Sequence, residues 1–168
     1  HPNKSRVQTF DIHPEIPMAD RHTFDLASHE VEEVNKKERF HRNYAAITVL
    51  KRCQEENRFA TPDEQIILSK YVGWGGIPEA FDERAGSWQT EFGMLKNILT
   101  PEEYASARES TLTAFYTPPV VIKAVYSALE NMHFQTGNVL EPSCGIGNFM
   151  GLVPESMNDA KFYGAELD

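Results

Sequence analysis

The sequence lacks the residue patterns that indicate a disulfide-linked, metal-binding or membrane-spanning protein. Its 168 residues contain only two cysteines, Cys53 and Cys144, which form no CxxC or Cys/His pair with metal-ligand spacing. The six histidines are scattered and include no HExxH motif. No apolar run approaches the roughly 20 residues that a helix needs to cross a bilayer, and no signal-peptide pattern opens the chain. We therefore expect reduced thiols, no metal site, no membrane association and a cytoplasmic location.

Basic residues are also scarce relative to acidic ones. The chain has 16 Lys and Arg against 25 Asp and Glu, which gives a formal net charge of −9. Because DNA binding requires clustered positive charge, this balance argues against strong nucleic-acid binding by the chain alone. Residues 36–57 are a local exception, which we interpret as a solvated helix face, with a phosphate-binding surface as the alternative. The basic residues of this segment are Lys36, Lys37, Arg39, Arg42, Lys51 and Arg52.

The first part of the chain is polar and has no apolar periodicity. Residues 1–34 contain Pro2, Pro14 and Pro17, so we expect an irregular arm. The chain opens on His1 rather than on Met, and it ends in a segment with the pattern of a strand. From both ends we expect it to be an internal piece of a longer protein.

Residues 35–114 have the pattern of a helical region. Apolar residues recur every three or four positions within 36–57, which predicts one amphipathic helix. Two Thr-Pro-x-Glu segments predict helix N-termini with capping boxes, and a third Thr-Pro start lacks the Glu. The further predicted helices cover 62–72, 88–98, 101–109 and 118–131. The apolar face comprises Phe40, Tyr44, Ile47 and Leu50, and the expected N-cap residues are Thr61, Thr100 and Thr117.

A glycine-rich loop interrupts the helical region. Residues 71–78 hold three glycines, one proline and one tryptophan, which predicts a tight turn. We expect Trp74 in this loop and Trp88 beyond it to pack over helix junctions, with stacking on a nucleobase as the alternative.

The sequence changes character at Gly137. Residues 138–141 predict a short buried strand, 142–147 a glycine loop, 148–153 a helix and 161–167 a second strand. This order is typical of the start of a parallel α/β sheet. We therefore divide the chain into the arm, the helical region 35–114 and an α/β region at 115–168.

The glycine loop is the segment best suited to bind a ligand. Gly145 and Gly147 allow close approach to the backbone and lead into a helix N-terminus. The dinucleotide fingerprint GxGxxG is not met, because Met150 stands at its third glycine. Glu141, at the end of the first strand, favours a ligand with a positive amino group over one with phosphates. A second acid, Glu166 or the less favoured Asp168, can accept hydrogen bonds from ribose hydroxyls. S-adenosylmethionine meets these requirements.

Three segments in this order resemble the motifs of the N6-adenine amino-methyltransferases. The segment Val139–Phe149 is similar to their cofactor loop, Phe115–Pro119 to their upstream motif and Phe162–Asp168 to their second-strand motif. The resemblance implies the start, with two strands, of a Rossmann-like methyltransferase sheet. It also implies that cofactor binding falls to Tyr116, Thr117, Pro118, Glu141, Pro142, Gly145, Gly147, Glu166 and Asp168.

Residues before these motifs indicate a narrower group of proteins within the family. Residues 57–65 and the loop 71–76 are similar to those of large helicase–methyltransferase proteins of bacterial conjugative elements and phages. In these proteins a helicase region follows the methyltransferase domain. The resemblance implies that the parent protein methylates adenine-N6 in DNA and that DNA is its partner.

The chain departs from the family in its catalytic motif. Amino-methyltransferases carry an Asn/Asp/Ser-Pro-Pro-Tyr/Phe motif that grips the target amino group and stacks on the flipped base, and this sequence contains none. We therefore assign no catalytic residue and expect the piece to be inactive alone. Two alternatives stay open: a helical module that docks DNA or another domain without cofactor, and a methyltransferase that acts on protein.

The two predicted strands would form only part of a sheet. Open strand edges and an uncovered apolar face favour either self-association through the sheet or poor order in this region.

Overall fold

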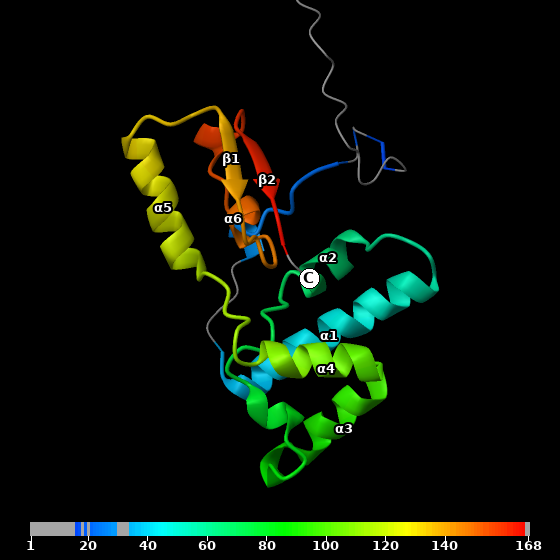
Figure 1. Ribbon diagram of the computed structural model, residues 1–168. Coiled ribbons are helices and arrows are strands. Elements are labelled where there is room, and N and C mark those ends of the chain that lie inside the picture. Colours follow the sequence, from blue (N-terminus) through cyan, green and yellow to red (C-terminus); the bar gives the residue numbers. More distant parts are fainter. Residues whose placement is uncertain (1–15, 18, 20, 30–33, 167–168) are drawn as a thin grey trace, which may run out of the picture.

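The computed structural model describes residues 16–17, 19, 21–29 and 34–166, and its helices and strands follow the expected order (Figure 1). The protein is a mixed α/β structure in which a helical part precedes two parallel strands. None of the helices in the described ranges is long and apolar enough to cross a membrane. The elements are α1 (Lys36–Glu55), α2 (Pro62–Leu68), α3 (Gln89–Ile98), α4 (Pro101–Ser110), α5 (Pro119–Asn131), β1 (Asn138–Glu141), α6 (Asn148–Gly151) and β2 (Lys161–Gly164).

Two of the three expected helix caps are confirmed. Thr61 and Thr100 cap α2 and α4, and each forms a complete capping box with the glutamate three residues later. Thr117 does not cap α5, since the N-cap residue is Pro118 and it makes no side-chain cap hydrogen bond. The sequence therefore places a capping box correctly only where the reciprocal Glu is present.

The helical part encloses one aromatic core. Trp74 and Trp88 are both buried in it, which confirms that they pack between helices. Their neighbours come from α1, the 3-10 turn Pro78–Phe81, α3 and α4. The buried residues of this core are Phe40, Trp74, Ile77, Ala80, Phe81, Trp88, Leu95 and Tyr104.

The buried face of α1 differs from the expected one. Phe40 is buried and Tyr44 and Ile47 are partly buried, but Leu50 is 47% exposed. Asn43 is buried on this face of α1 instead of Leu50, because its side chain hydrogen-bonds the loop 71–78. Apolar spacing alone could not reveal this polar contact. The buried residues of α1 are Phe40, Asn43, Ala46, Val49 and Cys53.

The junction of α1 and α2 is fixed by a buried carboxylate. Glu64 accepts hydrogen bonds from Arg52 at 2.6 Å and from two guanidinium nitrogens of Arg58 at 2.6 and 2.9 Å. It also accepts from the backbone N–H of Thr61 at 2.9 Å. These contacts hold the pKa of Glu64 well below its ordinary value, with the Arg58 hydrogen bonds as the largest cause.

The two strands form a parallel pair with one covered face. β1 and β2 pair in register, with Val139 opposite Phe162 and Leu140 opposite Tyr163. Phe162 packs on a core provided by α5, the residues that follow α6 and the turn Glu155–Met157. The core members are Ile122, Tyr126, Leu152 and Met157.

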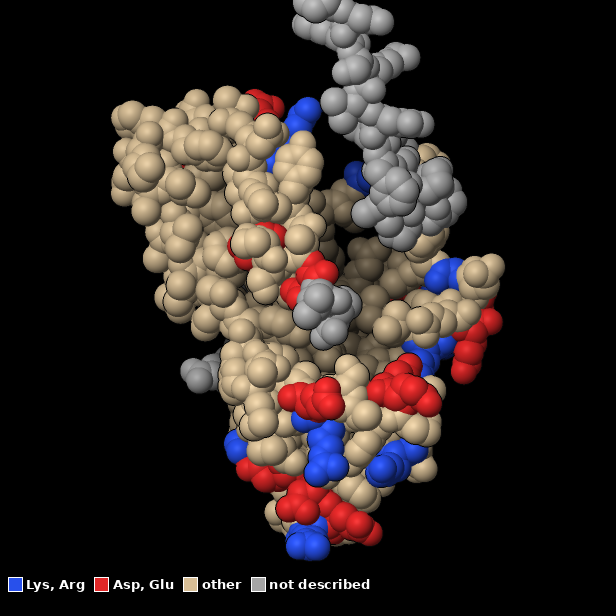
Figure 2. All heavy atoms as spheres, viewed as in Figure 1, with Lys and Arg blue, Asp and Glu red and all other residues tan. Residues whose placement is uncertain are grey.

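The opposite face of the strand pair is uncovered by the described residues. Leu140 is 66% exposed and its register partner Tyr163 is 52% exposed. Figure 2 shows this part of the surface, with α5, as largely free of charged side chains. Such a face suits further strands or a second copy, so the expected self-association through the sheet stays a prediction.

The Glu64 contacts predict an acid-sensitive helix junction. Glu64→Gln should lower the melting temperature at pH 7 by a few degrees, because it removes a charge that two arginines share. The contribution is complete above the ordinary carboxyl pKa of 4.5 and is lost as pH falls below it, since the folded pKa is depressed. The melting-temperature difference between the two proteins should therefore shrink as pH is lowered from 7 to about 3.

The matched control is Asp63→Asn, an exposed acid one position earlier in the first turn of α2. Thermal unfolding followed by circular dichroism measures both variants. An equal effect of the two substitutions at pH 7 would contradict the role of Glu64 at the junction.

Candidate functional site

The carboxyl ends of β1 and β2 bring the glycine loop and Glu166 together. The backbone N–H of Cys144 donates to Ala165 O and that of Ala165 donates to Glu141 O, both at 3.0 Å. One residue further on, the Gly145 N–H donates to the Glu166 Oε2 atom at 2.6 Å. The acid that sequence reasoning favoured for ribose binding therefore lies directly on the loop, whereas Asp168 falls outside the described residues.

Gly147 presents open backbone at the same loop. It adopts a φ of +80°, and a Cβ atom built on it would meet no atom within 4 Å. The loop can thus be approached closely at this position, as its sequence predicts. The helix that follows, α6, has only four residues. It is shorter than the expected 148–153, so the expected contribution of a helix N-terminus to binding is correspondingly weak.

Tyr116 lies between two glycine loops that are far apart in sequence. A Cβ atom on Gly73 would lie 2.6 Å from Tyr116 Cε2, and one on Gly145 would lie 2.7 Å from Tyr116 Cδ1. Both glycines have positive φ, +70° and +51°. The Tyr116 ring therefore contacts the helical region on one side and the loop 142–147 on the other, and neither contact leaves room for a side chain on the glycine.

In the helical region, two hydrogen bonds of the Asn43 side chain hold the loop that contacts Tyr116. Asn43 is fully buried, and its Nδ2 donates to Gly73 O at 2.7 Å while its Oδ1 accepts from Val72 N–H at 2.9 Å. Later in the same loop, the Gly76 N–H donates to Thr111 O at 3.1 Å. Sequence reasoning assigned Asn43 no role, and only the three glycines signalled that another segment approaches the loop closely.

The remaining residues of the upstream motif also reach the loop. Thr117 O accepts a hydrogen bond from Asn148 Nδ2 at 3.2 Å. Thr117 and Pro118 are both exposed. Asn148 was not among the expected site residues, and it joins the upstream motif to the first turn of α6.

Glu141 lies at the end of β1 as expected. Its Oε1 accepts from Ser143 N–H at 3.4 Å, and its charge helps to raise the pKa of Tyr126 to about 12, after burial as the main cause. Tyr126 therefore stays protonated and donates to Phe149 O at 2.6 Å. Pro142, which follows, is exposed.

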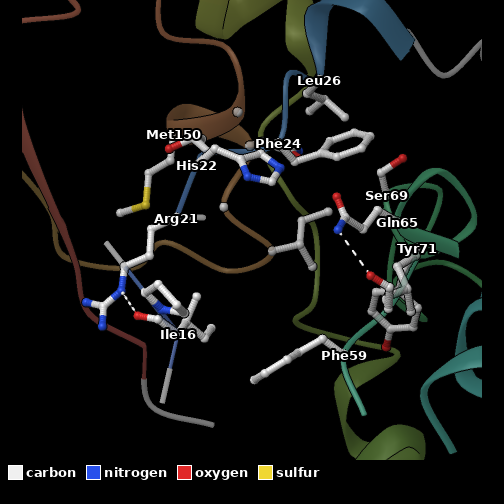
Figure 3. Close-up of a pocket in the computed structure, with 18 residues that line it drawn as sticks. Ile16, Arg21, His22, Phe24, Leu26, Phe59, Gln65, Ser69, Tyr71 and Met150 are labelled. Carbon is white, nitrogen blue, oxygen red and sulfur yellow. Dashed lines mark hydrogen bonds between the residues drawn. The ribbon is translucent and has the colours of Figure 1, made fainter. Parts of the chain in front are cut away.

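A cavity of about 1280 Å³ opens beside the loop (Figure 3). One wall comes from the described part of the arm, a second from α2 and its flanking residues, and the third from Ile146–Gly151. Tyr71 lines the second wall, and burial followed by the proximity of Tyr116 raises its pKa to about 12. Its hydroxyl is therefore protonated at neutral pH.

The arm is part of this structure and does not only link segments. Leu26 N–H donates to Gly151 O at 2.9 Å, and its side chain packs against the core of the α/β region. A Cβ atom on Gly151 would lie 3.0 Å from Leu26 Cβ. Residues 21–26 thus continue the wall that α6 begins.

The basic residues of α1 are engaged in ion pairs and backbone hydrogen bonds. Arg39 donates to Gly75 O at 2.9 Å. Figure 2 shows blue and red side chains side by side over the helical part. This arrangement agrees with a solvated helix face and gives no support to a phosphate-binding surface. The ion pairs are Lys36–Glu79, Lys37–Glu91, Arg42–Glu38, Lys51–Glu103 and Arg52–Glu64.

Comparison of the chain with protein-family models, with curated proteins and with solved structures finds no match. The chemistry of the site therefore has to be inferred from its own residues and contacts.

The contact of Tyr116 with Gly73 predicts a measurable coupling between the two positions. Gly73→Ala should cost on the order of 1 kcal/mol more stability when Tyr116 is present than in a Tyr116→Ala background, because only the ring collides with the new Cβ. Chemical denaturation of the four proteins in the double-mutant cycle measures the difference.

Gly76→Ala is the matched control for backbone strain. Its φ of +74° is close to that of Gly73, but the nearest atom to its Cβ would be 3.6 Å away. Its cost should be equal in both backgrounds. A Gly73→Ala cost that is also independent of Tyr116 would contradict the contact.

Proposed function

We propose that the chain is the cofactor-binding part of an S-adenosylmethionine-dependent DNA adenine-N6 methyltransferase with a Rossmann-like sheet. The observation that carries the proposal is the meeting of three segments around Gly145. Tyr116 packs on its α-carbon, Glu166 accepts its N–H, and Glu141 ends the strand before it. These are the segments whose order along the chain resembles the family motifs.

The residues present fit this cofactor. Gly147 leaves open space next to the backbone, which a flat or extended ligand can occupy. Glu141 and Glu166 place two carboxylates at one edge, which favours a positively charged ligand and disfavours a pyrophosphate. S-adenosylmethionine combines an amino group, a sulfonium and a ribose and carries no phosphate. When bound, it supplies an activated methyl group.

The residues of the site would have different roles. Glu166 would accept hydrogen bonds from the ribose hydroxyls while it holds the Gly145 N–H. Glu141 would attract the amino group through charge and ordered contacts. Tyr116 would fix the position of the loop against the helical region, and Thr117 with Pro118 would line the entrance next to Asn148.

The DNA substrate rests on the resemblance of the upstream segment to helicase-linked methyltransferases of mobile elements. The ion pairs on α1 neutralise most of the positive charge of that helix, so DNA binding would belong to other parts of the parent protein. The same ion pairs disfavour the alternative of a helical DNA-docking module. None of the contacts among the described residues favours protein as the methyl acceptor.

Binding of S-adenosylmethionine to the 168-residue chain tests the proposal directly. Glu166→Gln should weaken binding on the order of tenfold, since it replaces a charged hydrogen-bond acceptor with a neutral amide. Gly147→Ala should weaken it by a similar factor, because the new Cβ occupies the open approach and strains the backbone at a φ of +80°. Isothermal titration calorimetry measures all three proteins.

Glu102→Gln is the control, because Glu102 is exposed in the first turn of α4, away from the loop. It should leave the affinity unchanged. Absence of binding to the unmodified chain at millimolar ligand, or equal affinities in all variants, would contradict the proposed cofactor site. We expect no methyl transfer to DNA by the chain alone, which a radiolabel assay checks.

A further inference from the structure

A chain of backbone hydrogen bonds joins the arm to the glycine loop. Leu26 N–H donates to Gly151 O, and Gly151 N–H donates to Gly147 O, both at 2.9 Å. Gly147 N–H donates in turn to Cys144 O at 2.8 Å, and Cys144 N–H donates to Ala165 O at 3.0 Å. The arm is therefore connected, through α6 and the loop, to the carboxyl end of β2.

The helix in the middle of this chain, α6, depends on other segments for its position. It has four residues, and an isolated helix of this length is unstable in water. Two contacts hold its beginning: Asn148 Nδ2 donates to Thr117 O at 3.2 Å, and the Tyr126 hydroxyl donates to Phe149 O at 2.6 Å. The arm holds its last residue, Gly151, whose carbonyl would otherwise lack this partner.

Residues 24–29 of the arm, which we call the strap, form a short turn of their own. Asp25 Oδ1 accepts from Ala27 N–H at 3.1 Å and from Ser28 N–H at 3.3 Å. The other carboxylate oxygen of Asp25 accepts a hydrogen bond from the Ser28 hydroxyl. The Asp25 carboxylate therefore orders the backbone on both sides of Leu26.

The strap and α6 fit closely at one glycine. A Cβ atom on Gly151 would lie 3.0 Å from Leu26 Cβ and 3.4 Å from Phe24 O. The Leu26 side chain also packs against the core of the α/β region. In Figure 1 the strap, drawn in blue, passes next to α6. A side chain at position 151 would therefore push the strap away from the helix.

The strap is the least enclosed part of this arrangement. Leu26 is half-buried, and Asp25, Ala27 and Ser28 are exposed. Segments with few buried contacts open locally at a small fraction of the free energy of global unfolding. The order of α6 and of the loop before it then depends on how much of the time the strap is docked.

We propose that Leu26 is a positioning residue for the glycine loop: docking of the strap on α6 holds Gly147 and Asn148 in the arrangement that binds a ligand. Strap docking and ligand binding are then coupled, so that each favours the other by the same factor. The effect on the loop follows from the contacts alone. The effect on a ligand rests on the proposed function.

Amide hydrogen exchange of the 168-residue chain, followed by nuclear magnetic resonance, tests the effect on the loop without a ligand. Leu26→Ala should speed the exchange of the Gly147 and Gly151 amides about tenfold, because the strap is docked for less of the time. Leu26→Met keeps the side-chain volume and should restore slow exchange.

Leu129→Ala is the matched control, because Leu129 packs from α5 on the same core as Leu26. It should leave the exchange of the Gly147 and Gly151 amides nearly unchanged. Equal acceleration by Leu129→Ala and Leu26→Ala would show that a general loss of packing is the cause, which overturns the positioning role.

Gly151→Ala tests the contact from the side of α6. Its Cβ would press on Leu26, so it should speed exchange of the Leu26 amide although alanine favours a helix. Gly93→Ala in α3 is its control, since a Cβ there would meet no atom within 4 Å. The melting temperature and near-ultraviolet circular dichroism check that every variant is folded. An unchanged Leu26 amide in Gly151→Ala would contradict the close fit.

Titration with S-adenosylhomocysteine measures the coupling to a ligand. Leu26→Ala should weaken binding about fivefold and Leu129→Ala by less than about twofold. Because Leu26 itself lines the cavity, Asp25→Ala is a second variant: Asp25 does not line the cavity, and its loss should weaken binding in the same direction. Saturation with S-adenosylhomocysteine should slow exchange of the Leu26 amide in the unmodified chain.

The outcomes separate this inference from the proposed function. Unchanged Gly147 and Gly151 exchange in Leu26→Ala overturns the positioning role, whatever the affinity. Faster exchange with unchanged affinity overturns the coupling and leaves the proposed cofactor site intact. If the unmodified chain does not bind S-adenosylhomocysteine, the proposed function and the coupling both fail, and the exchange data still decide whether Leu26 positions the loop.

Discussion

The contact of the Tyr116 ring with two glycine α-carbons joins the two halves of the protein. Gly73 belongs to a loop of the helical region and Gly145 to the loop 142–147, and a side chain at either position would collide with the ring. The buried amide of Asn43 fixes the first loop, and the hydrogen bond between Gly145 and Glu166 fixes the second. The position of the loop 142–147 is therefore set by the helical region as well as by the strands that flank it.

The distribution of charge also differs between the helical part and the carboxyl edge of the strands. In the helical part, carboxylates pair with most of the basic residues of α1, and the Glu64 cluster fixes the α1–α2 junction. At the carboxyl edge of the strands, Glu141 and Glu166 create a negative site, while the adjoining cavity has no described acidic lining residue. The two environments therefore differ in charge although they adjoin the same loop.

The structure brings several of the expected site residues together, whereas their surroundings were not predicted. Glu141, Gly145, Gly147 and Glu166 lie at one edge because parallel strands end at the same side of a sheet. The contribution of Asn43, Asn148 and the cavity wall at Phe59 and Gln65 could not be predicted. These residues reach the site from segments whose approach depends on how α1, α2 and the arm pack, and Leu50 shows that even the buried face of α1 was not determined by apolar spacing.

The sequence by itself determined the local structure: the starts of α2 and α4 at Thr61 and Thr100, the burial of Trp74 and Trp88, and the strand–loop–helix–strand unit. Capping boxes and strand patterns depend on residues within a few positions of one another, so they can be recognised along the chain. Only the tertiary structure decided that Asn43 is buried on α1 while Leu50 is exposed, that Tyr116 lies between Gly73 and Gly145, and that the arm and α2 line a cavity beside Gly147. Those features depend on contacts between distant segments, and the packing of the whole core sets their geometry.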